Sequence, residues 1–102
     1  MHMKDRPVDM RLWRQFVAVA EELHFGRAAR GLHMTQPPLT QGIAQLESLL
    51  GVRLFERTKR QVRLSVAGGA LLPKVRELLA RARELPAVAR QRRMARPGAC
   101  GW

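Results

Sequence analysis

The sequence predicts a mainly helical fold in which three helices and a short β-hairpin form one small domain, followed by a long fourth helix. Apolar residues recur at three- and four-residue steps in four stretches, a pattern typical of helices with one buried face. Two short runs of strand-like residues, 55–57 and 62–64, stand between the third and fourth stretches. A chain of 102 residues, 46% of them hydrophobic, can bury one modest core.

The first helix is expected to begin after Asp9, whose side chain can cap it, and to reach about Leu23. Residues 1–8 show no apolar periodicity, and we expect them to form a flexible N-terminus. The predicted buried face of the helix consists of Leu12, Trp13, Phe16, Val17, Val19, Ala20 and Leu23.

A short second helix is expected from Arg27 to Leu32, opened by Gly26 after the Phe25 ring has entered the core. Its inward residues are small, so that a neighbouring helix can approach closely. These inward residues are Ala28, Ala29 and, at the end of the helix, Leu32.

A tight turn at 33–35 precedes the third helix, whose start is marked by Thr35 and the pair Pro37-Pro38. Proline is tolerated in a first turn because the backbone amides there have no helical partner. Gly51 is expected to end the helix. The predicted inner stripe consists of Leu39, Ile43, Leu46, Leu49 and Leu50.

The strands at 55–57 and 62–64 are expected to form a hairpin joined by residues 58–61, and this segment is strongly basic. Its cations could reach phosphates or the minor groove of DNA, where the negative electrostatic potential favours arginine. Alternatively, they form a solvated edge that discourages pairing with other strands. The cations are Arg57, Lys59, Arg60 and Arg63.

Ser65 is the expected cap of a fourth helix at 66–89, which follows the domain at 9–65. Pro73 is expected to kink this helix or to mark its true first turn, and Pro86 to end or bend it. Residues 90–102 lack a core pattern and are expected to be a disordered tail. A heptad seam suited to pairing with another helix comprises Leu71, Val75, Leu78, Ala82 and Leu85.

The formal net charge of +11 favours a nucleic-acid partner, because sixteen of the nineteen basic residues are arginines. A basic surface without such a partner is the alternative. The single cysteine, Cys100, cannot form an internal disulfide, which favours a reducing compartment. No apolar run approaches the roughly 20 residues of a membrane span, and no secretory signal is evident, so we expect a cytoplasmic protein without a membrane partner.

The third helix has the chemistry of a helix that reads the major groove. Residues near the N-terminus of such a helix meet base edges; glutamine can bind adenine through two hydrogen bonds, and threonine can contact a base or a phosphate. Arg27 is well placed to bind a phosphate, and Arg30 is a weaker candidate. The candidate base-facing residues are Gln36, Pro37, Thr40, Gln41 and, one turn further on, Gln45.

The proline pair affects Thr35 directly. A capping hydroxyl normally accepts from the amides two and three residues on, and here both positions are prolines. We therefore hypothesise that the Thr35 hydroxyl is free to donate to a phosphate. The alternative is that the prolines only start the helix.

Together these residues resemble the N-terminal DNA-binding domain of the LysR-type transcriptional regulators. The similarity extends over about 8–85. The matching strings are FVAVAEELHF (16–25), RAA (27–29), LHMTQPPLTQ (32–41), LE (46–47), LGVRLFERT (50–58), VRLS (62–65) and AG (67–68).

The resemblance implies a winged helix-turn-helix homodimer that binds double-stranded DNA at two half-sites. It implies that the third helix enters the major groove, that the hairpin is the wing and that the fourth helix links the two protomers. Promoter binding, with activation or repression, follows from the family alone. By position, Gln36, Pro37, Thr40 and Gln41 would face bases, whereas Thr35, Arg27 and Arg57 would hold the backbone or minor groove.

The sequence departs from the family pattern in four respects. Lys59 stands where glycine is frequent, which predicts a strained or altered wing tip, and Gly26 stands where a capping threonine is common. Pro86 is unfavourable in a linker helix. Family members also carry a regulatory domain of two α/β lobes that senses a small effector. This chain ends before such a domain, which suggests a truncated, frame-shifted or excised form.

Three other functions are open. A small basic RNA-binding protein usually exposes aromatic residues, and the three phenylalanines here occupy core-like positions. An enzyme would need partners for His2, His24 or His33, and no carboxylate pair, ligand cluster or cofactor motif accompanies them. The third is a fragment that acts only by forming heterodimers with full-length regulators.

Overall fold

The structure is a computed structural model that describes residues 8–95. Residues 1–7 and 96–102 lie outside the described range, and so do the predicted flexible N-terminus at 1–7, the 96–102 part of the predicted tail, His2 and Cys100. Within this range the elements are α1 (Met10–Glu22), α2 (Phe25–Gly31), α3 (Gln36–Leu50), β1 (Phe55–Arg57), β2 (Val62–Leu64) and α4 (Val66–Ala95). The predicted mainly helical architecture is confirmed.

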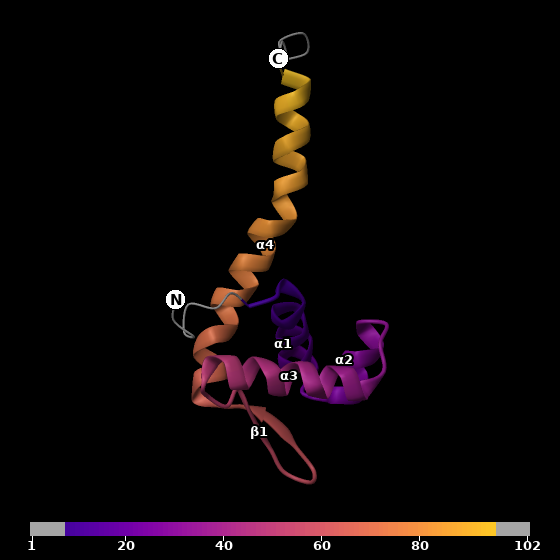
Figure 1. The fold of residues 1–102 in the computed structure, drawn as a ribbon, viewed down its shortest axis with the longest axis vertical. Coiled ribbons are helices and arrows are strands. Elements are labelled where there is room, and N and C mark those ends of the chain that lie inside the picture. Colours follow the sequence, from indigo (N-terminus) through magenta and orange to yellow (C-terminus); the bar gives the residue numbers. More distant parts are fainter. Residues whose placement is uncertain (1–7, 96–102) are drawn as a thin grey trace.

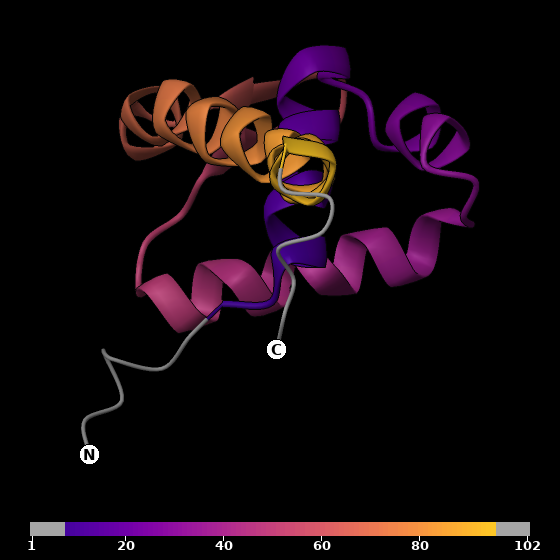
Figure 2. The same cartoon turned by 90° about the horizontal axis from the view of Figure 1, so that it is seen from above.

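Helix α1 is the centre of the domain. It contacts α2, α3 and α4, and it lies between α2 and α4 when the molecule is viewed from above (Figure 2). Helix α3 and the hairpin lie toward one end of the molecule, whereas the far end of α4 projects from the other (Figure 1). The elements with predicted DNA contacts are therefore well separated from the C-terminal half of α4.

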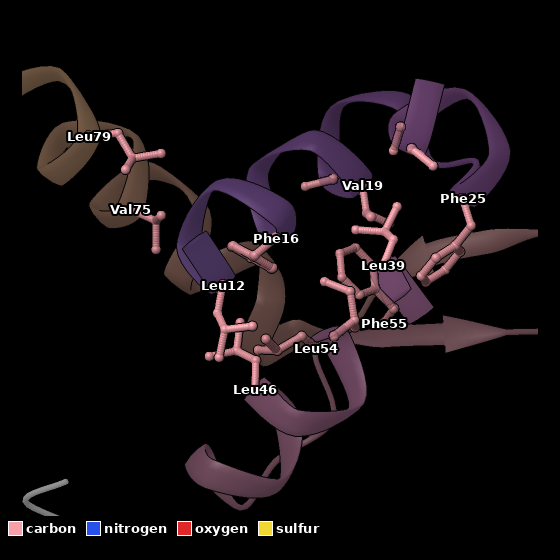
Figure 3. Packing of buried hydrophobic residues seen from close by; sticks show 14 residues of the cluster. Leu12, Phe16, Val19, Phe25, Leu39, Leu46, Leu54, Phe55, Val75 and Leu79 are labelled. Atoms are coloured by element: carbon pink, nitrogen blue, oxygen red, sulfur yellow. The ribbon is translucent and has the colours of Figure 1, made fainter. Parts of the chain in front are cut away.

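The core is apolar and draws on every helix and on β1 (Figure 3). The three phenylalanines meet in it: the ring centroids of Phe16 and Phe55 are 5.6 Å apart, and those of Phe25 and Phe55 are 6.2 Å apart. These tilted and edge-on contacts are favourable aromatic geometries. The three phenylalanine rings are thus buried in the core, where they are not free to stack on RNA bases.

Helix α1 begins as expected, because the carboxylate of Asp9 accepts a hydrogen bond from the backbone N–H of Arg11 (2.8 Å). The expectation that Leu23 belongs to the buried face is wrong. Leu23 is the C-cap residue, with a left-handed φ of 50°, and is 42% exposed. The backbone leaves the helix there, which turns the side chain away from the core.

Helix α2 begins two residues earlier than expected, at Phe25, and ends at Gly31. The residue that opens it is His24 rather than Gly26. His24 is extended, and its Nδ1 accepts a hydrogen bond from the backbone N–H of Arg27 (3.0 Å). An imidazole nitrogen thus performs the capping role usually filled by a threonine or aspartate oxygen.

Helix α3 has the expected inner stripe and ends at Gly51, whose φ of 75° is left-handed. Leu39, Ile43 and Leu46 are fully buried. Gly42 also faces inward, where an added Cβ would collide with the side chain of Gln15 on α1. The lack of a side chain at Gly42 leaves room for the end of the Gln15 side chain between the two helices.

The hairpin has the expected strands, paired antiparallel with Phe55 opposite Leu64 and Arg57 opposite Val62. The Thr58 hydroxyl accepts hydrogen bonds from the backbone N–H groups of Arg60 and Gln61 and so closes the turn. Left-handed φ angles in residues 8–95 occur only at Leu23, His33 and Gly51. The strain expected at Lys59 is therefore absent, because its backbone is not left-handed.

Helix α4 begins after Ser65, whose hydroxyl oxygen accepts from the backbone N–H of Gly68 (3.0 Å). The helix continues through Pro73 and Pro86 to Ala95, so neither a late first turn at Pro73 nor an end near 89 is correct. Each proline removes one backbone hydrogen bond, yet a helix can continue past it with a bend. Figure 1 shows the axis of α4 changing direction along its length.

Candidate nucleic-acid interface

The exposed face of α3 is polar. It carries no charged side chain along the helix, all of which the structure describes. Exposed side chains follow one another at helical spacing on the side opposite the buried stripe. They are Gln36, Pro37, Pro38, Gln41, Ala44, Gln45 and Ser48, with Thr40 half-buried beside them. Amides and hydroxyls on one helix face can donate to and accept from base edges without repelling phosphate.

The N-cap of α3 lacks a side-chain hydrogen bond, as expected. Thr35 is extended, and its hydroxyl makes no capping hydrogen bond. Because Pro37 and Pro38 have no N–H, the hydroxyl lacks its usual donors. Thr35 is exposed and available to an external group.

The start of α2 lies next to the start of α3. A Cβ at Gly26 would come within 3.5 Å of Oε1 of Gln36, so the predicted base-reading amide rests beside the glycine. Arg27 is exposed nearby, and its Nε donates to Oε1 of Glu22 at 3.3 Å. An exposed ion pair of this kind contributes little, which leaves the Arg27 guanidinium accessible to an anion.

The wing carries cations on its exposed surface. Lys59, Arg60 and Arg63 are all exposed, and Arg60 and Lys59 lie in the turn that Thr58 closes. Arg57 differs from them, because its guanidinium carbon lies 4.7 Å from the centroid of the Phe25 ring. The wing cluster therefore contains one stacked arginine and three freely exposed cations.

Glu47 makes contacts that the sequence patterns did not predict. It lies on α3 with a side chain only 12% exposed, and its Oε2 accepts from the backbone N–H groups of Leu54 (2.8 Å) and Phe55 (3.2 Å). Its Oε1 lies 3.9 Å from a guanidinium nitrogen of Arg57. The LE pair at 46–47 is one of the strings shared with the family and could have drawn attention to Glu47. Its partners could not be predicted from that string, because Leu54 and Phe55 lie seven and eight residues further along the chain.

The predicted pairing seam of α4 is divided in the structure. Val75 is buried against α1 together with Leu79, so it belongs to the core of its own chain (Figure 3). Leu71 and Ala82 are half-buried. Leu78 and Leu85 are 42% and 64% exposed, and the neighbouring Val88 is 50% exposed. The seam available to another molecule is therefore Leu78, Leu85 and Val88.

The fold and the site define a class: a helix-turn-helix domain with a hairpin wing and a long helix that leaves the domain. The family model for bacterial regulatory helix-turn-helix proteins of the lysR family matches residues 10–69. The chain belongs to this family, and its described residues form the DNA-binding domain of a LysR-type transcriptional regulator, not of an enzyme. Among the helices of residues 8–95, none has the length and apolar character required to cross a membrane.

Three known proteins illustrate the similarity. The HTH-type transcriptional regulator IlvR of Caulobacter vibrioides is 53% identical over 91 residues, covering 89% of this chain and 31% of IlvR. The CbnR DNA-binding domain, solved in complex with DNA, is 40% identical with a TM-score of 0.75 and is matched over 86% of this chain and 99% of its own. The BenM DNA-binding domain, solved with catB site 1 DNA, is 35% identical with a TM-score of 0.78, over 81% and 92% of the two chains. This chain spans about a third of the length of IlvR.

Proposed function

We propose that this chain regulates transcription by binding duplex DNA in a sequence-specific manner, with α3 in the major groove and the hairpin beside it. The observation that carries the proposal is the uncharged amide-and-hydroxyl face of α3 next to an exposed cationic wing. The similarity of the fold to the CbnR and BenM domains, both solved with DNA, supports it. Activation or repression of a promoter, and a cytoplasmic site of action, are part of the same proposal.

Contacts to bases are assigned to the exposed face of α3 between residues 36 and 45. Gln36 and Gln41 are the principal base readers, because exposed glutamine amides can distinguish adenine through its N6 and N7 atoms. Supporting base contacts are assigned to Pro37, Thr40 and Gln45.

Contacts to the DNA backbone are assigned to residues around this helix. The Thr35 hydroxyl and the Arg27 guanidinium would hold phosphates at the start of α3. On the wing, Arg57, Lys59 and Arg60 would lie along a phosphate strand or in the minor groove.

We also propose that the chain acts as a homodimer through α4. Leu78, Leu85 and Val88 expose apolar surface, and the part of α4 beyond Leu85 projects from the domain (Figure 1). An isolated helical segment of this length is marginal in water, so a second helix packed along it would stabilise it. Two such protomers would meet half-sites about one helical turn of DNA apart, or a multiple of it.

Base reading is tested with a duplex enriched from a random library by the 102-residue chain. Gln36→Ala and Gln41→Ala should each weaken binding to this duplex by about 1–3 kcal/mol and leave binding to random duplex nearly unchanged. Gln91→Ala makes the same change on the far part of α4 and is the control. Equal losses on both duplexes would show that α3 does not read bases.

Dimerisation is tested by Leu78→Asp, which places a charge on the exposed apolar seam. Sedimentation should show a monomer, and cooperative binding to two half-sites should disappear while the fold is retained. Ala80→Asp adds the same charge at an exposed position two residues along the helix and should have little effect. A dimer that survives Leu78→Asp would contradict the assignment, and a mixture with a full-length relative would reveal heterodimers.

A further inference from the structure

One carboxylate connects the third helix to the wing. Two consecutive backbone N–H groups, those of Leu54 and Phe55, donate to the same oxygen of Glu47 at 2.8 and 3.2 Å. These amides lie where the chain enters β1, so the bonds hold the base of the wing against α3. Hydrogen bonds to a charged, largely buried carboxylate are among the stronger ones in proteins.

The second oxygen of Glu47 faces Arg57, two residues further along β1. The N···O distance of 3.9 Å is that of a loose ion pair, and the Arg57 guanidinium also lies over the Phe25 ring at 4.7 Å. Phe25 is the first residue of α2, so Arg57 is placed by two different helices. Its side chain remains 38% exposed, which leaves part of the guanidinium open to DNA.

We propose that Glu47 is a positioning residue that sets the place of Arg57 and of the wing relative to α3, and thereby contributes to sequence specificity without touching DNA itself. This inference rests on the proposed DNA-binding function. The carboxylate acts through Arg57 and through the amides of Leu54 and Phe55.

The physical reason is that binding to cognate DNA requires a more accurate position of the wing relative to α3 than binding to random DNA does. On the cognate site the α3 amides must meet their bases while the wing contacts the same duplex, so the distance between the two elements matters. Binding to random DNA is mainly electrostatic and tolerates many arrangements of the same cations. A loosened Arg57 would therefore lower the preference for the cognate site more than it lowers general affinity.

The experiment compares Glu47→Gln with Glu56→Gln. Glu56 lies on β1, is exposed and forms no ion pair in the described part of the chain, so its variant removes the same charge without breaking a contact. Dissociation constants are measured for the enriched duplex and for random duplex at several salt concentrations. For Glu47→Gln, the ratio of the two constants should fall at least about fivefold, the lower end of what one base contact contributes. For Glu56→Gln, the ratio should stay within about twofold of the wild-type value.

A readout without DNA accompanies the binding data. Amide proton shifts of Leu54 and Phe55, measured by NMR, should move upfield in Glu47→Gln, because a neutral amide oxygen is a weaker acceptor than a carboxylate. In the Arg57→Ala background, Glu47→Gln should lower the specificity ratio less than it does in the wild-type chain, because only the route through the amides of Leu54 and Phe55 remains. Equal ratios for Glu47→Gln and Glu56→Gln, or full additivity with Arg57→Ala, would overturn the proposal.

A second variant covers the case in which Glu47→Gln does not fold. Arg57→Lys keeps the charge but loses the planar group that stacks on Phe25, and it leaves the Glu47 bonds to the backbone intact. Its specificity ratio should also fall about fivefold, and a wild-type ratio would refute the inference. If the wild-type chain itself shows no preference for any duplex, the proposed function fails instead, while the NMR shifts still report whether Glu47 holds the wing.

Discussion

Helix α3 and the wing are neighbours with opposite surface chemistry, and they are attached to the domain in partly different ways. The exposed face of α3 is uncharged, and its other face is fastened by the fully buried Leu39, Ile43 and Leu46. The exposed part of the wing is cationic. Its base is fastened by the buried Phe55 and also by polar contacts: the carboxylate of Glu47 at its entry and, at its exit, the hydroxyl of Ser65, which donates to the Arg53 carbonyl at 2.6 Å.

This contrast suits a domain in which one element is proposed to read bases and its neighbour to bind the DNA backbone. A helix held by apolar burial is placed rigidly, as direct contacts with base edges require. A two-stranded hairpin has too little apolar surface to be stable alone, so it depends on hydrogen bonds and on its neighbours. In the proposed complex, its charges would attract DNA phosphates in a way that depends little on the base sequence.

The largest effect is expected from breaking the attachment of α3. Ile43→Ala removes a fully buried side chain and should lower the free energy of unfolding by about 2–5 kcal/mol, measured by urea denaturation. Gln45→Ala, on the exposed face of the same helix, should leave stability nearly unchanged. A loss below about 1 kcal/mol for Ile43→Ala would mean that apolar burial does not hold α3.

The next effect concerns the base of the wing. Gly68 packs so closely that a Cβ would collide with the Leu54 carbonyl oxygen, a backbone atom that cannot turn away. Gly68→Ala should therefore destabilise the domain by about 1–3 kcal/mol. Gly69→Ala meets nothing within 4 Å and, as a helical substitution, should stabilise by up to about 1 kcal/mol. The two unfolding curves should shift in opposite directions, and a common direction would contradict the close packing at Gly68.

A smaller effect should distinguish the charge of the wing from the amides of α3. Arg60→Ala removes one exposed cation and should weaken binding to all duplexes alike. The slope of log affinity against log salt should decrease in magnitude by about one. Arg90→Ala, on the projecting part of α4, is the matched control. A loss confined to the enriched duplex would assign base reading to the wing and remove the contrast with α3.

The smallest effect is expected in α1, on which both α3 and α4 rest. The hydrogen bond from the backbone N–H of Arg11 lowers the pKa of Asp9 below its ordinary value of 3.8. The charged cap therefore contributes stability above pH 3.8, and this contribution is lost as the pH falls through the lowered pKa of the folded state. Asp9→Asn keeps a capping oxygen, but the asparagine amide does not titrate. The difference in the free energy of unfolding between this variant and wild type should therefore change with pH only in this acid range. Urea denaturation between about pH 2 and 6 measures it, and a difference that varies near neutral pH would point to another group.

The sequence predicted most accurately those boundaries that local chemistry sets. Asp9, Gly51 and Ser65 each act on backbone groups within a few residues, and all three caps are present. Both strands also have the expected ends, because strand-forming residues lie directly on either side of the turn at 58–61. The start of α2 was misjudged because histidine is an uncommon cap. The end of α4 was misjudged because a proline weakens a helix without always ending it.

Sequence patterns were enough to predict the order of the elements, the apolar stripe of α3, the neutral face opposite that stripe and the basic wing. Periodicity and local backbone chemistry encode these features. Three contacts became apparent only in the folded chain: Val75 faces its own domain, Arg57 stacks on Phe25, and Glu47 binds the entry of the wing. Such contacts join residues far apart in the chain, and their partners are set by how the helices pack rather than by any pattern within one segment.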